Sequence, residues 1–372
     1  MAEVDGLRFI AIFSVMLFHI YFAANHIPGV LLAPTRFHSL FWPVSHGFRG
    51  VQLFFVISGF ILGLPFANQY VANGPGVALG RFYLRRLTRL EPPYVLALFL
   101  IYAAALLTQN VHTHEPGFLS GLPLRLGYSY LFFRGAPPTL DGVTWTLEIE
   151  VQFYLLAPFL AQVFKLAAGP RRLALLVAIC GFPPLADILP RGGLTLLGFA
   201  QFFLTGFLLA DLHTTGFGLG RVQPRALDLL GFVCLLALVL VPETPSWMPL
   251  LPCLLAGIFV GALRGHWFTS FLRRPAVSVL GGMCYSLYLL HYPFLSFIAA
   301  KIISNGQSLP RACMRLGMVG MPVAVGAGLM YYILIERPCM NPNWPHAAWQ
   351  RCLRMIDAIS AAFKATSKST VD

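Results

Sequence analysis

Long apolar segments follow one another along the chain, and short polar or proline-containing stretches separate them. The hydrocarbon core of a bilayer is about 30 Å thick, so a helix needs roughly 20 residues to cross it. The pattern predicts an all-α, polytopic bundle of about ten transmembrane helices. The ten segments are 7–24, 50–67, 90–108, 143–164, 173–190, 194–212, 226–242, 247–263, 277–300 and 315–336.

The composition also indicates a membrane protein. Hydrophobic residues make up 57% of the 372 positions and charged residues 11%, and the mean hydropathy is +0.72. Soluble domains carry roughly 25% charged residues, so this chain has too few charges to cover a globule in water. We expect one membrane domain over residues 1–340, with a retained first helix and no separate soluble domain. Residues 341–372 are expected to form a cytoplasmic tail.

The basic residues predict an orientation in the membrane. The net charge of +12 does not indicate nucleic-acid binding, because Lys and Arg lie at the ends of apolar segments and form no continuous basic domain. In a ten-helix topology, 18 of the 26 Lys and Arg residues fall on the side that both termini share. Since cytoplasmic loops are enriched in Lys and Arg, we expect a multi-pass protein of the cell (inner) membrane, surrounded by lipid, with both termini cytoplasmic.

The seven cysteines are scattered without CxxC spacing, and four of them lie inside apolar segments. This is typical of Cys used as a small buried hydrophobic residue. We expect neither a metal site nor a disulfide framework.

The first predicted helix carries two ionisable residues on one face. Arg8 and His19 are 11 residues apart, which is close to three whole turns and about 16 Å along the axis. His19 is therefore expected deep in the bilayer, where a polar side chain costs free energy unless it is paired or functional. A neutral imidazole can exchange a proton near physiological pH, as general acid–base chemistry requires. The alternative is a histidine that only hydrogen-bonds to a neighbouring helix.

A basic cluster lies just before the third predicted helix. Arg86 and Arg89 are an i, i+3 pair on one helix face, and Arg85 reaches the same side as Arg89. Guanidinium groups bind phosphate oxygens bidentately, so the cluster suits a phosphorylated ligand in the cytosol. The alternative is an anchor that fixes topology by binding anionic lipid headgroups.

Two further segments combine aromatic and ionisable residues. In the segment that begins at Trp145, Glu148 and Glu150 are two residues apart and point to nearly opposite helix faces, so they do not form a catalytic dyad. Glu148 is expected at the membrane interface and Glu150 toward the bundle centre. Tyr288 and His291 share one helix face, so they are expected to line a polar cavity.

Together and in this order, these segments resemble the acyltransferase-3 family of integral membrane O-acyltransferases. The opening Asp5-Gly-Leu-Arg-Phe-Ile-Ala11 with His19, the segment 50–60 (GVQLFFVISGF) and the segment 82–89 (FYLRRLTR) are similar to its first three motifs. Residues 145–154 and 285–291 match two later ones. The resemblance covers residues 5 to about 338.

Two positions depart from the family pattern. Gln52 stands where the family usually has Asp. In the fourth motif the family more often has two adjacent acids, whereas here Glu150 matches the first and Val151 replaces the second. The resemblance therefore assigns a role to Glu150 with less support than to the arginines.

The resemblance implies transfer of an acyl group, often acetyl from acetyl-CoA, to a hydroxyl of a carbohydrate such as exopolysaccharide or O-antigen. It implies that Arg85, Arg86 and Arg89 bind the phosphates of acyl-CoA. His19 would accept the acceptor's proton or briefly carry the acyl group, and Arg8 and Glu150, the other two candidate catalytic residues, would orient His19 or the thioester. Tyr288, His291 and Trp145 are the candidate substrate-binding residues, and His291 is also a candidate to orient His19.

A transporter is the alternative from another functional class. It would move an acyl donor or a glycolipid across the membrane and use His19 and Glu150 as a proton relay. The arginine cluster disfavours this alternative, and no inverted repeat is visible between the two halves of the chain.

Overall fold

The computed structural model describes residues 1–31, 41–108, 119–137, 141–188, 195–216, 222–242, 244, 247–341, 344 and 350. Within these ranges the chain is all-α, as predicted, and its only β pairing is a single bridge between Leu31 and Ser308. The stretch between the third and fourth predicted helices, residues 109–142, falls partly outside the described residues. Most of the predicted tail over 341–372 also lies outside them.

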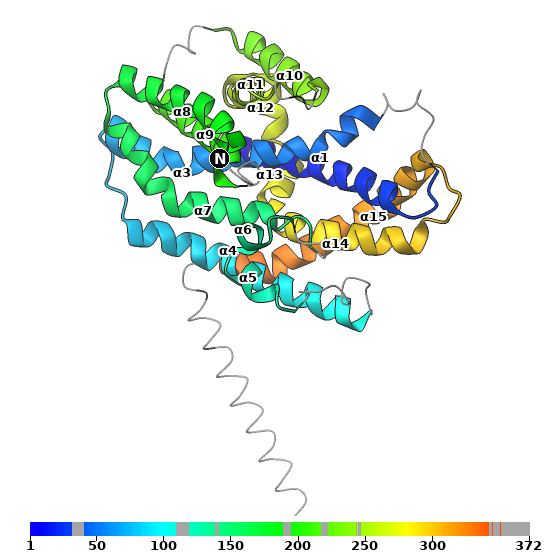
Figure 1. Cartoon of the computed structure of the whole chain (residues 1–372). Helices are drawn as coiled ribbons and strands as arrows, with labels where there is room; N and C mark the ends of the chain where they lie inside the picture. The colour runs from blue at the N-terminus through cyan, green and yellow to red at the C-terminus, as the bar shows by residue number, and fades with distance from the viewer. Residues whose placement is uncertain are drawn as a thin grey trace, which may run out of the picture.

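The helices form one bundle, and α1 lies inside it (Figure 1). α1 contacts α3, α11, α12, α13, α14 and α15. The main helices are α1 (Ala2–His26), α3 (Gly50–Val71), α4 (Leu79–Leu107), α5 (Leu122–Leu126), α6 (Tyr130–Arg134), α7 (Trp145–Leu160), α8 (Ala168–Ile188), α9 (Leu196–Thr215), α10 (Pro224–Leu240), α11 (Leu250–Arg264), α12 (Trp267–Leu272), α13 (Pro275–Gly282), α14 (Cys284–Ile302), α15 (Leu309–Tyr331) and α16 (Arg337–Cys339). A π-helical turn, Tyr332–Glu336, joins α15 to α16.

Glycines allow neighbouring helices to approach α1 closely. A Cβ at Gly50 would collide with the carbonyl of Ala11, and a Cβ at Gly281 would collide with the carbonyl of Asp5. In membranes small residues favour helix association because they let the backbones pack against each other. These two contacts hold α3 and α13 against the N-terminal half of α1.

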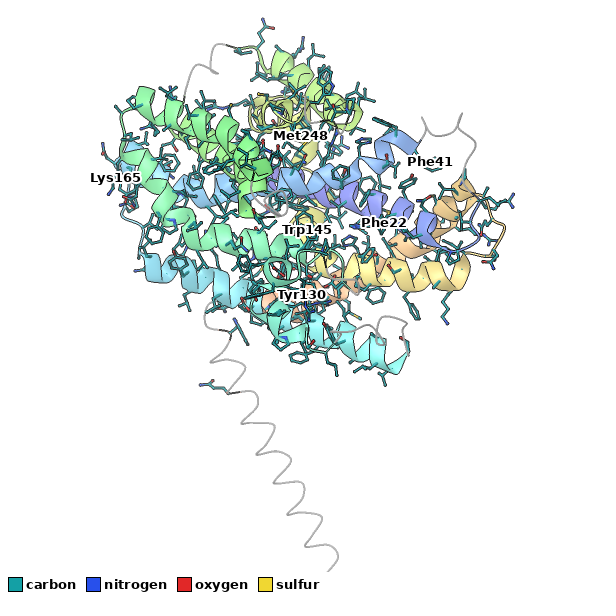
Figure 2. The ribbon with its side chains drawn as sticks, viewed as in Figure 1. Phe22, Phe41, Tyr130, Trp145, Lys165 and Met248 are labelled. Carbon is teal, nitrogen blue, oxygen red and sulfur yellow. The ribbon has the colours of Figure 1, made fainter. Side chains whose placement is uncertain are left out.

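The outer surface of the bundle is apolar. Leu107 is 85% exposed, Phe159 72% and Leu229 65%, and Figure 2 shows side chains projecting from the helices around the whole outline of the bundle. A surface of this kind is stable against lipid rather than water. Together with the long apolar helices, it identifies a multi-pass membrane protein.

A helix occupies each of the ten predicted segments, but not every helix is long and apolar enough to cross a bilayer. Among the described residues six helices meet that requirement, or seven if the bent pair α13–α14 is one span. α10 has 17 residues and α11 has 15. The count of ten spans and the orientation of the termini therefore stay predictions.

The structure corrects the start of the third predicted helix. α4 begins at Leu79 rather than at residue 90, so the arginine cluster lies within the helix and not before it. Hydropathy finds the point where a helix enters lipid, but a helix continues beyond that point when its residues favour it. Leu and Arg are good helix formers, and the arginines are displayed on two turns of α4.

Pro92 and Pro93 lie inside α4, where each removes a backbone hydrogen-bond donor. Side chains from other segments bond to carbonyls around this break. The indole of Trp344 donates to the carbonyl of Thr88 (3.2 Å), and the hydroxyl of Tyr285 donates to that of Leu90 (3.0 Å). Pro92 leaves the carbonyl of Thr88 without its helical donor, and the bond from Trp344 satisfies that carbonyl.

The ninth predicted segment, 277–300, is two helices rather than one. α13 and α14 meet at Met283 with a bend of 71°. The bend places the N-terminus of α14 inside the bundle, where Cys284, Tyr285 and Tyr288 line a cavity. A hydropathy pattern is insensitive to this bend because both helices are apolar.

Helices α5 and α6 pack beside the middle of α4. The hydroxyl of Tyr94, halfway along α4, donates to the carbonyl of Arg125 (3.0 Å), and its ring stacks on Tyr128. The carboxylate of Glu148 accepts the backbone N–H of Leu131 in the first turn of α6 (2.8 Å). Glu148 is 2% exposed, so the prediction that it lies at the membrane interface is wrong. The side chain of Glu148 instead accepts a hydrogen bond from an otherwise unpaired N–H group at the N-terminus of α6.

Candidate functional site

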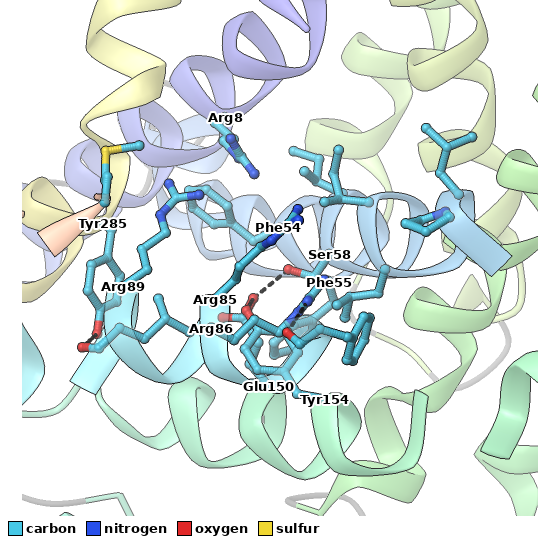
Figure 3. Close-up of a pocket in the computed structure, with 18 of the residues that line it drawn as sticks. Arg8, Phe54, Phe55, Ser58, Arg85, Arg86, Arg89, Glu150, Tyr154 and Tyr285 are labelled. Atoms are coloured by element: carbon cyan, nitrogen blue, oxygen red, sulfur yellow. Dashed lines mark hydrogen bonds between the residues drawn. The ribbon is translucent and has the colours of Figure 1, made fainter. Parts of the chain in front are cut away.

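A cavity of about 1110 Å³ lies between α3, α4, α7 and the N-terminus of α14. Figure 3 shows its side chains converging from these helices and from α1. Five arginines line it, whereas Glu150 is its only carboxylate among the described lining residues. The arginines are Arg8, Arg81, Arg85, Arg86 and Arg89. Such a concentration of positive charge favours an anionic ligand.

Helix α4 places the predicted arginines of its cluster on the cavity wall. Arg86 is held in place, because it donates to the carbonyl of Phe82 (2.7 Å) and its guanidinium lies 3.7 Å from the centre of the Phe82 ring. Arg89 lies 3.9 Å from Glu336. Arg85 makes no ion pair with any residue that the structure describes. The cluster therefore keeps donor groups available to a bound ligand.

Glu150 is fixed from two sides. Its Oε1 accepts the hydroxyl of Ser58 on α3 (2.5 Å) and the hydroxyl of Tyr154 one turn further along α7 (Figure 3). Sequence reasoning did not select Ser58 or Tyr154 as site residues. The spacing of Tyr154, four residues after Glu150, was the available signal.

Glu336 was not among the predicted site residues, but it contacts Arg89 of the cavity wall. It is 0% exposed, and its Oε2 accepts both the backbone N–H (3.1 Å) and the hydroxyl (2.5 Å) of Ser286. These groups lie in the first turn of α14, whose unpaired N–H groups favour a negative charge. Glu336 thus stabilises the bend at Met283 and holds Arg89 at the cavity.

Tyr288 is part of the cavity wall. Its hydroxyl donates to the backbone carbonyl of Val143 and is hydrogen-bonded to Thr146. Its ring meets Phe54 edge-on, with 6.4 Å between the ring centres. Tyr288, Thr146 and Phe54 line the cavity, as the sequence predicted for Tyr288, and the bonds to 143–146 hold the tyrosine in this position.

Two histidines lie beyond Tyr288. Nε2 of His291 is 3.0 Å from Nδ1 of His19, and the His291 ring centre is 6.0 Å from that of Tyr288. His291 is 0% exposed. Neither histidine is among the residues that line the cavity. The structure therefore brings together His19 and His291, which are 272 residues apart. Tyr288 lines the cavity with the arginines and neighbours His291, so it connects the two regions.

Trp145 and Gln52 lie elsewhere. Trp145 packs against Phe199, with 5.3 Å between the ring centres, and does not line the cavity. Gln52 is 7% exposed, and its Oε1 has no hydrogen-bond partner among the described residues. It also does not line the cavity.

Asp141 is a buried carboxyl group outside the spanning helices. It is 0% exposed, and neither carboxylate oxygen has a hydrogen-bond partner among the described residues. Burial raises the pKa of Asp141 to about 7, although the charge of Arg125 acts in the opposite direction. Asp141 can therefore change its charge near neutral pH.

Comparison with known proteins identifies the family. Residues 1–335 match the family model described as an acyltransferase domain. The chain belongs to the acyltransferase-3 family. The five arginines of the cavity and the histidine pair all lie within the matched residues.

Relatives in the acyltransferase-3 family carry O-acetyltransferase names. O-acetyltransferase OatA of Staphylococcus aureus (strain NCTC 8325 / PS 47) is 24% identical over 332 residues, covering 81% of this chain and 51% of OatA. A protein of S. aureus (strain MRSA252), provisionally named an O-acetyltransferase, is 24% identical over 399 residues, covering 97% of this chain and 61% of that protein. YrhL of Bacillus subtilis (strain 168), provisionally named a peptidoglycan O-acetyltransferase, is 28% identical over 185 residues, covering 47% of this chain and 26% of YrhL.

This member of the acyltransferase-3 family thus spans about half to three fifths of the length of the S. aureus relatives that it matches. No solved structure matches the chain.

Proposed function

We propose that the chain is a membrane O-acetyltransferase that moves an acetyl group from acetyl-CoA to a hydroxyl of a carbohydrate. The observation that carries this proposal is the arginine-lined cavity next to a pair of histidines. One part is suited to bind an anion and the other to move a proton, and the two adjoin at Tyr288. Membership of the acyltransferase-3 family supports the same reaction.

The donor occupies the arginine-lined cavity. CoA carries a pyrophosphate and a 3′-phosphate, and Arg85, Arg86 and Arg89 present guanidinium groups that bind such oxygens. Its thioester lies at the end of a long flexible arm, away from the phosphates. The arm runs toward Tyr288, and the acetyl group then lies near the histidines.

His19 moves the proton in the reaction. It takes the proton of the acceptor hydroxyl, and the electron pair of the broken O–H bond stays on the acceptor oxygen. That oxygen attacks the acetyl carbonyl, the C–S bond breaks, and the thiolate of CoA leaves and receives the proton from His19. Glu150 and Arg8 act at the cavity wall, where Glu150 is held by Ser58 and Tyr154.

The acceptor is a glycan hydroxyl. The provisional name of YrhL points to peptidoglycan as the acceptor of that relative, and exopolysaccharide and O-antigen present the same chemistry. Comparing the cell-surface glycans of a deletion strain and a complemented strain by mass spectrometry identifies the acceptor. The acetylated glycan should lose one acetyl group in the deletion strain and regain it on complementation.

The arginine-lined cavity opens to the cytoplasm in this proposal, because both termini are cytoplasmic and acetyl-CoA is a cytosolic metabolite. The bundle has ten spans, with α8, α10 and α11 among them. A reporter fused after Asp372 and another inserted near His112 should report opposite sides of the membrane. Two reporters on the same side would contradict the ten-span topology.

Purified protein in nanodiscs tests the activity. We expect release of CoA from acetyl-CoA that depends on an added glycan, together with one acetyl group gained by that glycan. A transporter would leave acetyl-CoA intact. The proposed function is refuted if CoA is not released in the presence of any of the glycans that are acetylated in the source cells.

A further inference from the structure

The hydrogen bond between the two histidines allows their protons to be placed. Nδ1 of His291 lies 2.9 Å from the carbonyl oxygens of both Leu287 and Tyr288. A carbonyl oxygen only accepts hydrogen bonds. Nδ1 of His291 therefore carries a proton and donates it to these carbonyls.

The surroundings of His291 favour its neutral form. The side chain is 0% exposed, and its polar partners among the described residues are His19 and the two carbonyls, with no carboxylate. Burial of an unpaired charge costs much free energy. In a neutral imidazole one nitrogen carries the proton and the other holds a lone pair, so Nε2 of His291 is an acceptor.

The position of the proton on His19 can be inferred from the acceptor that faces this residue. Nδ1 of His19 lies 3.0 Å from Nε2 of His291, so Nδ1 must donate the proton that this bond needs. The backbone of Val15, one turn earlier, is a second hydrogen-bond partner of His19. Nε2 of His19 then holds the lone pair.

We propose that His291 is a positioning residue that fixes the tautomer of His19, so that Nε2 of His19 is the basic nitrogen of the site. This inference rests on the proposed function, in which His19 exchanges a proton with the acceptor. In serine proteases a carboxylate holds the catalytic histidine in the correct tautomer. Here a neutral imidazole, itself anchored to two backbone carbonyls, has that role.

The arrangement also gives the proton a defined route. When Nε2 of His19 takes the proton of the acceptor hydroxyl, the proton on Nδ1 moves toward Nε2 of His291. The positive charge is then shared with a ring whose Nδ1–H already faces two carbonyl oxygens. Nε2 of His19 returns its proton to the departing thiolate, and both imidazoles regain their starting form.

The tautomer is measured directly by NMR. The full chain is labelled with ¹⁵N-histidine and placed in nanodiscs, and the His19 signals are assigned by their loss in His19→Gln. We expect Nδ1 of His19 to be protonated and Nε2 to be unprotonated in the wild type. His291→Ala should populate both tautomers, and His291→Gln should keep the wild-type one because its amide oxygen can accept from Nδ1.

Kinetics give the second measurement. Loss of a partner that orients a functional histidine typically costs about 10–100-fold, so we expect His291→Ala to lower kcat by this amount. His291→Gln should restore most of that loss. The KM for acetyl-CoA should stay unchanged because His291 does not line the cavity. The matched control is His26→Gln, a change on the same helix as His19 at an exposed histidine that contacts the carbonyl of Phe22.

An unprotonated Nδ1 of His19 in the wild type overturns the proposal. Retention of both the tautomer and the rate in His291→Ala does so as well. If the wild type transfers no acetyl group, the proposed function fails alone, because the chemical shifts report the tautomer without turnover.

Discussion

The arginine-lined cavity and the histidine pair adjoin at Tyr288 and carry charge in different ways. The cavity has five guanidinium groups, and Glu150 is the one carboxylate among its described lining residues. The two histidines are bonded to each other and to backbone carbonyls, and they form no ion pair with a described residue. The first region presents permanent charge, and the second holds a neutral group that can take up a proton.

The difference follows from the physical needs of the two tasks. Binding phosphate requires charge that does not depend on pH, which Arg provides. Proton transfer requires a group that is neutral at rest, and a nearby cation would oppose its protonation. Arg8 and His19 lie on one helix about 16 Å apart, so α1 keeps the two kinds of charge separate. Changes in one region should therefore leave the function of the other intact.

The largest effect is expected from His19→Ala. Removing a positioned acid–base group typically lowers a rate by about 10²–10⁴-fold, so kcat for acetyl transfer should fall by this amount while binding of acetyl-CoA stays the same. His19→Gln keeps hydrogen bonding but exchanges no proton at neutral pH, and it should be equally inactive. A near wild-type rate for His19→Gln would remove His19 from the mechanism.

In the cavity we expect the opposite pattern, in which substitutions weaken the binding of acetyl-CoA. Arg86→Ala and Arg89→Ala should each weaken apparent affinity for acetyl-CoA by about 1.5–3 kcal/mol, because each removes a charged hydrogen-bond donor. Binding of acetyl-CoA is measured in nanodiscs, and the expression level of each variant is measured in parallel. Arg315→Ala, which changes an exposed arginine outside the cavity lining, is the control. A parallel loss of expression and activity would mean that the arginines fix topology instead.

A third prediction concerns Asp141, which contributes to neither region. Its pKa is raised to about 7 in the folded protein, against 3.8 for an ordinary Asp. The folded state therefore retains a proton that the unfolded state has lost, and stability falls as the pH rises through this range. Between pH 5 and 8 the free energy of unfolding should fall by about 3 kcal/mol.

Thermal unfolding in nanodiscs at pH 5, 6, 7 and 8 tests this dependence. Asp141→Asn has no carboxyl to ionise, so it should reduce the pH dependence and raise stability at pH 8. Asp187→Asn, at an exposed position, should leave the pH dependence unchanged. An unaltered pH dependence in Asp141→Asn would exclude Asp141 as its source.

The smallest effect is expected at the boundary between the two regions. Tyr288→Phe keeps the ring but leaves the Val143 carbonyl without its hydroxyl donor, which should cost about 1 kcal/mol of stability. The rate should change little, since the ring still forms part of the cavity wall. Tyr83→Phe removes a hydroxyl bonded to the carbonyl of Leu155 at the surface and is the matched control. A large loss of kcat in Tyr288→Phe would give the hydroxyl a part in the reaction.

Features that depend on one helix were predictable from the sequence. Apolar segments of membrane length predicted the all-α bundle, because lipid requires each segment to satisfy its own backbone. The helical period predicted that Arg85, Arg86 and Arg89 share a wall and that Glu148 and Glu150 point apart. Such predictions hold because side-chain direction within a helix follows from residue spacing alone.

The tertiary structure determines which groups these residues contact. Glu148 satisfies the first turn of α6, whereas Glu150, two residues later, faces the cavity. The bend at Met283 was invisible in the hydropathy, since both helices are apolar and Glu336, which satisfies the new N-terminus, comes 50 residues after Ser286. His19 and His291 meet across 272 residues. No period along the chain relates residues so far apart, because only the packing of α1 against α14 sets their distance.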